Sequence, residues 1–193
     1  MRFIRDIITP VIVALVIFAL LQVTVGSFKI HGSSMLPNIQ QDECIIVNKA
    51  AYFFHSPQSG EVVVLHSPLN PNSDLIKRII ALPGDTIEIK DGTVIVNNVP
   101  LVEDYIQEKP NYTFLSQEIL PDHYFVLGDN RNNSSDSHKG WTVPRENIVG
   151  KAWFVYWPLQ KWSLIKHYTP SADKQAAKIG NPSLTLRMLC PMK

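Results

Sequence analysis

Cysteine is scarce in this chain, with only Cys44 and Cys190 among 193 residues. A small secreted domain held by disulfides carries more cysteines, and a structural zinc site needs clustered ligands. The six histidines are scattered, with no H-x-x-x-H spacing, and there is no C-x-x-C pair. We therefore expect no metal and no cofactor. Two unpaired thiols are the simpler interpretation, and one long-range disulfide between Cys44 and Cys190 is the alternative.

Charge is also in short supply. Charged residues make up 18% of the chain and the net charge is +1, whereas about a quarter of the residues are charged in an average globular protein. No lysine- and arginine-rich run is interleaved with aromatic residues, so nothing would steer the chain toward a polyanion. Nucleic acid is therefore not expected as a partner. Internal repeats are absent, and 193 residues suffice for one domain with a sound core, or a core plus a small insert.

What the chain does have is one long apolar run near its N-terminus. From Ile7 to Val25 the sequence is IITPVIVALVIFALLQVTV, without a charged residue. A helix that crosses a bilayer needs about 20 apolar residues, so we expect a transmembrane anchor at residues 7–26. Two arginines precede it, which favours a cytoplasmic N-terminal tail at residues 1–6. A cleaved secretory signal peptide is the alternative, but its apolar core is shorter and ends at a small-residue site that is missing here.

Beyond Gly26 the pattern changes from that of a helix to that of strands. Short β-branched runs bounded by turn formers predict strands at 44–47, 61–65, 123–127 and 152–157. The clearest local pattern is a hairpin at 86–96, in which Asp91-Gly92 supplies the turn between two alternating strands. No long helical stripe follows residue 30.

These patterns predict a mainly β fold: an antiparallel β-sheet domain with a small β-hairpin insert, preceded by one transmembrane α-helix. We expect the domain at residues 27–168, outside the cytoplasm, with the inserted β region at about 86–122. Residues 169–193 are polar and unpatterned, and we interpret them as a loosely held C-terminal tail.

Four blocks of sequence carry residues suited to catalysis: GSSMLP at 32–37, IKRIIALPGD at 76–85, GDNRNNSSDS at 128–137 and VPRENIVGKA at 143–152. A serine hydroxyl is a poor nucleophile until a neighbouring base takes its proton. An ordinary lysine, with a pKa of about 10.4, is neutral in only about 1 molecule in 2,500 at pH 7. Burial among apolar groups lowers that pKa by several units. In a strand Lys77 and Arg78 face opposite ways, so one can be buried while the other meets solvent.

In this order, behind a single apolar segment, the four blocks closely resemble type I signal peptidases, the membrane-bound Ser/Lys endopeptidases. The resemblance covers about residues 7 to 160, and it is to the short form with one anchor. It implies that Ser34 is the nucleophile and Lys77 the general base. It also implies that the Ser134 hydroxyl hydrogen-bonds to Lys77 and orients it.

The same resemblance gives supporting roles to Asp129, Arg131 and Asp136, with a carboxylate–guanidinium pair holding their loop. Substrates would be exported preproteins, cut after small residues at positions −1 and −3. By position, shallow apolar pockets for those residues would be lined by Phe28, Ile30, Met35, Ile39, Leu75 and Ile76. The resemblance further implies membrane lipid as a partner, admits a contact with the protein-export machinery, and places the protein in a plasma or thylakoid-type membrane.

The sequence departs from the family pattern at four positions. Gly32 stands where some members carry a hydroxyl residue that donates to the oxyanion, so that donor is lost here. His138 replaces a frequent arginine, Asn38 a common threonine and Ala81 a common glycine. These differences concern loop details and leave the Ser34 and Lys77 assignments in place.

Three other functions compete with this interpretation. A Ser-His-Asp hydrolase would carry G-x-S-x-G, which is missing. A self-cleaving repressor would need a DNA-binding domain, and none fits before residue 30. A non-catalytic anchored β-domain that binds partners would leave preprotein processing undisturbed when Ser34 is changed to alanine.

Overall fold

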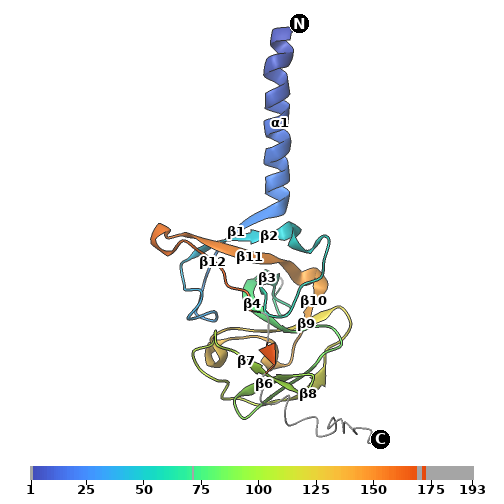
Figure 1. Cartoon of the computed structure of the whole chain (residues 1–193), viewed down its shortest axis with the longest axis vertical. Helices are drawn as coiled ribbons and strands as arrows, with labels where there is room; N and C mark the ends of the chain where they lie inside the picture. The colour runs from blue at the N-terminus through green and yellow to red at the C-terminus, as the bar shows by residue number, and fades with distance from the viewer. Residues whose placement is uncertain (1, 71, 169–170, 173–193) are drawn as a thin grey trace, which may run out of the picture.

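The computed structural model of the chain describes residues 2–70, 72–168 and 171–172. It begins with one helix, α1 (Arg2–Thr24), and continues in strands joined by loops and short 3-10 helices. Figure 1 shows α1 standing out from one end of a β domain, with β1, β2 and β11 nearest to the helix and β6, β7 and β8 at the far end.

Two antiparallel sheets make up the domain. The larger sheet has the order β1 (Val25–Lys29), β2 (Cys44–Asn48), β11 (Ile148–Trp157), β3 (Val62–His66), β4 (Asp74–Ala81), β9 (His123–Leu127) and β10 (Val143–Pro144), with β12 (Ser163–Leu164) on β11. The smaller sheet has the order β13 (Ser171–Ala172), β7 (Val99–Val102), β6 (Thr93–Val96), β5 (Thr86–Lys90) and β8 (Phe114–Glu118). The 3-10 helices are η1 (Lys49–Tyr52), η2 (Arg131–Asn133), η3 (Ser137–Lys139), η4 (Arg145–Asn147) and η5 (Leu159–Lys161). The predicted fold class, mainly β and antiparallel behind one apolar helix, is confirmed.

The inserted region is larger than the hairpin that the sequence predicts. The hairpin of β5 and β6 is present, and Asp91 and Gly92 take the positive φ values of 51° and 72° that its turn needs. It forms part of a five-stranded sheet, because β7, β8 and β13 add to it. β13 comes from the segment expected to be a tail, and Ser171 pairs with Val102 of β7. The rest of the expected tail, 169–170 and 173–193, lies outside the described residues.

The helix α1 is apolar along most of its length. Its segment Asp6–Thr24 has a mean hydropathy of 2.6 and no side chain buried against the domain, so it is long and apolar enough to cross a membrane. The helix ends at Thr24, two residues before the predicted end of the anchor. The chain turns into strand there because Val25 and Gly26 pair with Asn48 and Val47 of β2.

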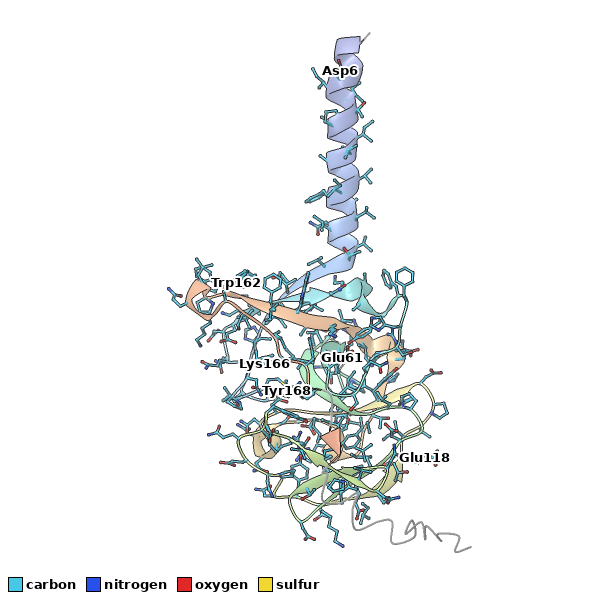
Figure 2. The ribbon with its side chains drawn as sticks, in the orientation of Figure 1. Asp6, Glu61, Glu118, Trp162, Lys166 and Tyr168 are labelled. Atoms are coloured by element: carbon cyan, nitrogen blue, oxygen red, sulfur yellow. The ribbon has the colours of Figure 1, made fainter. Side chains whose placement is uncertain are left out.

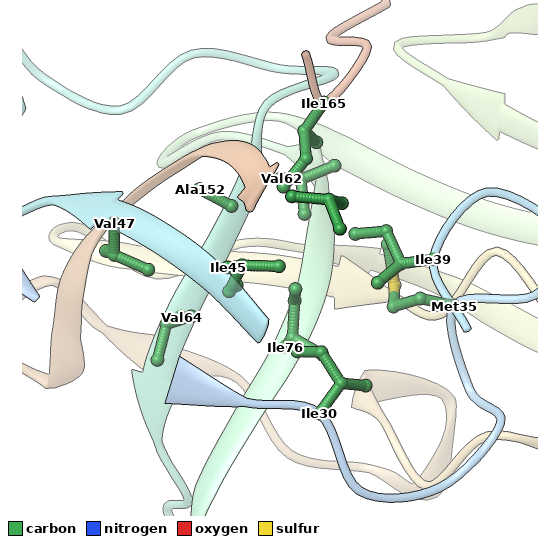
Figure 3. Close-up of a cluster of buried hydrophobic side chains, with 11 residues drawn as sticks. Ile30, Met35, Ile39, Ile45, Val47, Val62, Val64, Ile76, Ala152 and Ile165 are labelled. Carbon is green, nitrogen blue, oxygen red and sulfur yellow. The ribbon is translucent and has the colours of Figure 1, made fainter. Parts of the chain in front are cut away.

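The core beside β4 holds the loop between β1 and β2 in place. Ile30, Met35 and Ile39 come from that loop and are nearly fully buried against side chains of β2, β3 and β4. Figure 3 shows Ile30 against Ile76 of β4, and Met35 beside Ile39. Burying a side chain of this size contributes about 1.5–3 kcal/mol, so the loop is fixed to β4 by its own apolar residues.

A second apolar cluster joins the two sheets. Ile80 and Ala81 of β4 and Phe125 of β9 pack against Ile87 and Ile89 of β5, and all five are at most 1% exposed. The smaller sheet therefore packs on the strand that carries Lys77, and the two share one close-packed core.

Candidate active site

Ser34 and Lys77 meet where the loop between β1 and β2 contacts strand β4 of the larger sheet. Ser34 lies on the loop between β1 and β2, and Lys77 lies on β4 with 3% of its surface exposed. Lys77 Nζ donates to Ser34 Oγ at 2.8 Å and to the Ile76 carbonyl oxygen at 3.0 Å. Within the described chain Ser34 Oγ has no other hydrogen-bond partner, and no histidine ring reaches it. The arrangement suits a serine nucleophile with a lysine base.

Burial makes Lys77 better able to act as a base. Loss of hydration lowers the pKa of Lys77 to about 8, while the carboxylates of Asp136 and Asp129 act in the opposite direction and raise it. At such a pKa about one lysine in ten is neutral at pH 7. That fraction is more than a hundred times larger than for a solvated lysine, and it makes Lys77 a usable base near neutral pH.

The loop that carries Ser34 is also held from the side of β9. The Asn130 N–H donates to the Ser34 carbonyl oxygen at 2.9 Å, and Asn130 Nδ2 donates to the Ser33 carbonyl oxygen at 3.1 Å. Gly128, two residues earlier, lies against both Ser34 and Ser134. The polar block 128–137 therefore packs directly on the backbone of the nucleophile loop.

Ser134 lies at this contact, as the resemblance implied, but its predicted hydrogen bond is not formed. Its Oγ is buried and has no partner among the residues that the structure describes, and Lys77 Nζ donates elsewhere. A buried hydroxyl without a partner is uncommon and costly. Ser134 is thus a polar group in the site that is free to make a new hydrogen bond during the reaction.

Asp129 forms a buried pair with Arg78, the residue after Lys77. Arg78 Nε and Nη2 donate to the two carboxylate oxygens of Asp129 at 2.8 and 2.7 Å. Arg78 is 1% exposed, so the expectation that it meets solvent opposite Lys77 is wrong. It can be buried because Asp129 neutralises it and the Gly60 carbonyl oxygen accepts from its Nη1 at 2.8 Å.

Arg131 is buried in a second pair, with Glu103 of the inserted region. Arg131 Nη2 donates to Glu103 Oε1 at 2.7 Å, and Nη1 binds the other carboxylate oxygen. The loop 128–137 is therefore held by two carboxylate–guanidinium pairs, and each has its partner outside the loop. No sequence pattern pointed to Glu103, which precedes Arg131 by 28 positions.

Asp136 organises the other end of the loop. Its Oδ2 accepts from the Gly128 N–H at 2.9 Å, and its Oδ1 lies 2.7 Å from His138 Nδ1. The His138 ring stacks on Tyr112 at 4.1 Å between centroids. His138 thus keeps the contact with a carboxylate that an arginine could make at this position.

A groove leads away from the dyad between β1 and β4. It is lined by Phe28, Lys29, Ile30, His31, Ser34, Val64, Asp74, Leu75, Ile76 and Lys77. Phe28, Ile30, Leu75 and Ile76 were predicted to line it, whereas Val64 and the polar residues at its rim were not. Met35 and Ile39 are not part of this lining. Each is 1% exposed in the core, because the loop that carries them folds inward over β2.

Both walls of the groove are unpaired strand edges. β1 pairs with β2 alone within the described part of the chain. In β4, residues 74–77 pair with β3 on one side, while pairing with β9 begins only at Arg78. Apart from the Ile76 carbonyl oxygen, which accepts from Lys77 Nζ, the unpaired N–H and C=O groups of these edges are available to an extended peptide.

Gly32 leaves an open space two residues before Ser34. Its φ is +88°, and a β-carbon placed on it would meet no atom within 4 Å. The Ser34 N–H donates to no acceptor among the described residues, and it is thus available to an oxyanion. Among these residues no group of three His, Cys, Asp or Glu side chains could hold a metal ion. Cys44 forms no disulfide with a described residue, and Cys190 lies outside them.

Comparison with protein families gives one match that covers most of the chain. Residues 2–157 match the family described as "Signal peptidase, peptidase S26".

Individual proteins agree with this match. The chain is 39% identical over 176 residues to the probable signal peptidase I-1 of Synechocystis sp., covering 87% of this chain and 90% of that protein. It is 42% identical over 139 residues to the signal peptidase I of Leptolyngbya laminosa, covering 68% of each. The thylakoidal processing peptidase 1 of Arabidopsis thaliana is 36% identical over 144 residues, covering 69% of this chain and 42% of that protein. Among solved structures, a signal peptidase I from Enterococcus faecalis is 32% identical and covers 50% of this chain and 96% of that one, with a TM-score of 0.46.

Proposed function

This chain belongs to the signal peptidase family of serine peptidases, and we propose that it removes signal peptides with Ser34 as nucleophile and Lys77 as general base, from an anchored position in the membrane. The observation that carries the dyad is the 2.8 Å hydrogen bond between Lys77 Nζ and Ser34 Oγ, on a lysine that is almost fully buried. Asp136 and Asp129 are too far from the nucleophile to bond it, and they act on Lys77 through their charge.

The reaction begins when neutral Lys77 takes the proton of Ser34 and Oγ attacks the carbonyl carbon of the scissile bond. The oxyanion that forms is met by the Ser34 N–H, and Gly32 adds no hydroxyl donor. The Lys77 ammonium then protonates the leaving amine, which releases the mature protein and leaves an ester on Ser34. Water, deprotonated by Lys77, hydrolyses the ester and releases the signal peptide. The buried hydroxyl of Ser134 forms a hydrogen bond with the Lys77 amine as the amine moves during the reaction.

The preprotein would bind as an extended strand between the free edges of β1 and β4. Phe28, Ile30, Leu75 and Ile76 give the lining of the groove its apolar part. Such shallow apolar pockets accept alanine-sized residues at −1 and −3 and exclude larger ones by clash. Main-chain hydrogen bonds to both edges would supply affinity that does not depend on the substrate sequence.

The membrane position rests on α1 and on the surface around its end. The aromatic surface consists of exposed aromatic and leucine side chains: Phe53, Phe54, Trp153, Trp157, Leu159, Trp162 and Leu164. Figure 2 shows Trp162 at the end of the domain from which α1 leaves. Tryptophan and phenylalanine favour the zone of lipid headgroups. The N-terminus would lie in the cytoplasm, and the β domain outside it, at the height where a bilayer-inserted signal peptide ends.

Two variants test the dyad in the full chain placed in membranes. Ser34→Ala and Lys77→Arg should both abolish cleavage of a preprotein, since a guanidinium keeps the charge but gives no base. Lys151→Arg is the matched control, because the partly buried Lys151 pairs with the carboxylate of Glu61 and an arginine keeps the charge that this pair needs. Cleavage by Lys77→Arg near the wild-type rate would refute the dyad.

A further inference from the structure

One buried residue of the inserted region, Tyr105, lies against residues that surround the dyad. Tyr105 follows β7, and 6% of its surface is exposed. Its hydroxyl donates to Glu103 Oε1 at 2.6 Å and accepts from Arg131 Nη2 at 3.3 Å. Its ring lies 4.4 Å from the Arg78 guanidinium carbon. Tyr105 therefore stands between the two buried arginines of the site.

A third contact joins Tyr105 to the nucleophile loop. Asn38 Nδ2, four residues after Ser34, donates to the Tyr105 carbonyl oxygen at 2.8 Å and to Asp129 Oδ2 at 2.8 Å. One residue of the inserted region thus contacts the loop of Ser34, the strand of Lys77 by way of Arg78, and the loop of Ser134 by way of Arg131.

These contacts act on the charge around Lys77. Asp129 raises the pKa of Lys77, and Arg78 offsets that effect by pairing with Asp129. The rings of Tyr105 and Tyr168, 4.8 Å apart, lie 4.4 and 5.1 Å from the Arg78 guanidinium carbon and hold the guanidinium in the pairing position. Buried cation–ring contacts are stronger than exposed ones because water does not compete with them.

We propose that Tyr105 is a positioning residue for the dyad, through which the inserted region fixes Arg78 and the nucleophile loop relative to Lys77. The role of the insert is then to set the geometry and the charge of the catalytic centre. This inference rests on the proposed dyad, and it concerns residues that do not touch the substrate.

The test compares two variants of the full-length protein in detergent or lipid. Tyr105→Phe keeps the ring on Arg78 and should retain most activity. Tyr105→Leu removes the ring, and its kcat should fall about tenfold, as expected from loss of a buried cation–ring contact, with KM for the preprotein unchanged. With Arg78 less firmly held, Asp129 acts more strongly on Lys77, so the pH dependence of kcat should move to higher pH.

Tyr52→Leu is the matched control. Tyr52 is also buried, donates to the Glu61 carboxylate at 2.8 Å and has its ring centroid 5.4 Å from the Arg145 guanidinium carbon, but none of these contacts involves Arg78, Arg131 or the loop of Ser34. Its loss should lower the melting temperature and leave the pH dependence of kcat in place. A Tyr105→Leu protein that behaves like Tyr52→Leu, with kcat per folded enzyme and pH dependence unchanged, would overturn the inference. Activity in Ser34→Ala would instead overturn the dyad itself.

Discussion

Gly128 and Ser34 are packed backbone to backbone. A β-carbon placed on Gly128 would lie 2.5 Å from the Ser34 carbonyl oxygen and 2.4 Å from Ser134 Oγ. Real β-carbons do not come so near to a backbone oxygen, so one of the two loops would have to move. The closeness lets the Asn130 N–H reach the same oxygen, and it makes the position of Ser34 depend on the absence of a side chain at residue 128.

We predict that Gly128→Ala lowers kcat at least about a hundredfold, because a misplacement of about 1 Å at a catalytic group has that cost. The measurement is preprotein cleavage per folded enzyme. Gly140→Ala is the control: Gly140 has φ +94° and open space around it, so this variant should lose about 1 kcal/mol of stability and keep its activity. Equal activity of the two variants would contradict the prediction.

Activity should rise with pH through the value at which Lys77 loses its proton. Burial lowers the pKa of Lys77 to about 8, so below that pH kcat/KM should fall about tenfold per pH unit. Asp136 raises the pKa of Lys77, and Asp136→Asn should therefore shift the profile to lower pH. Asp91→Asn, in the distant hairpin turn, should leave the profile unchanged. An optimum near pH 5 in the wild-type protein would refute a lysine base.

Ser134→Ala should give a rate between those of the wild type and Ser34→Ala. General acid–base catalysis raises the rate by a factor of about 10²–10⁴. Loss of a hydroxyl that only orients the base should therefore lower the rate by a smaller factor. The exposed neighbour Ser135 is the matched control, and Ser135→Ala should retain full activity. If Ser134→Ala is folded and as inactive as Ser34→Ala, Ser134 has a covalent role.

His167 makes the domain sensitive to acid. Its Nδ1 accepts the Val62 N–H at 3.1 Å, and burial lowers the pKa of His167 to about 4. The unfolded chain binds a proton at about pH 6.5, so stability contributed by neutral His167 is complete above that pH and is lost as the pH falls toward 4. We predict a melting temperature that drops across this window, and a smaller drop in His167→Gln. His55→Gln, at an exposed histidine, should show the same drop as the wild type.

The aromatic surface should contact lipid. Single-tryptophan proteins that keep only Trp162 or only Trp141 can be placed in vesicles with brominated lipids, which quench nearby indole fluorescence. Trp162 is 69% exposed, whereas Trp141 packs against the core that includes Tyr124 and Val143. We expect quenching of Trp162 and none of Trp141. If each protein fluoresces as strongly in brominated lipid as in ordinary lipid, the aromatic surface stays in water.

The elements fixed by local chemistry could be predicted, and those fixed by distant partners could not. Asp91-Gly92 defines its hairpin without help from the rest of the chain, because only certain residues accept positive φ. Arg78 was expected in solvent, since alternation along a strand says which residues share a face but not what lies above that face. Its partner Asp129 is 51 positions away. Met35 and Ile39 were expected at the groove for a similar reason: they lie in a loop, where no periodicity fixes the direction of a side chain.

If the preprotein binds between the unpaired edges of β1 and β4, as proposed, the order of cleavage and folding during secretion follows. A polypeptide can bind between these edges only as an extended segment whose backbone N–H and C=O groups are not already hydrogen-bonded. A passenger that had collapsed into its native structure near the cleavage point would offer no such strand. In the proposed binding mode, the residues around the cleavage site must be unfolded when the enzyme cuts, and a passenger whose fold includes those residues would stay tethered to its leader.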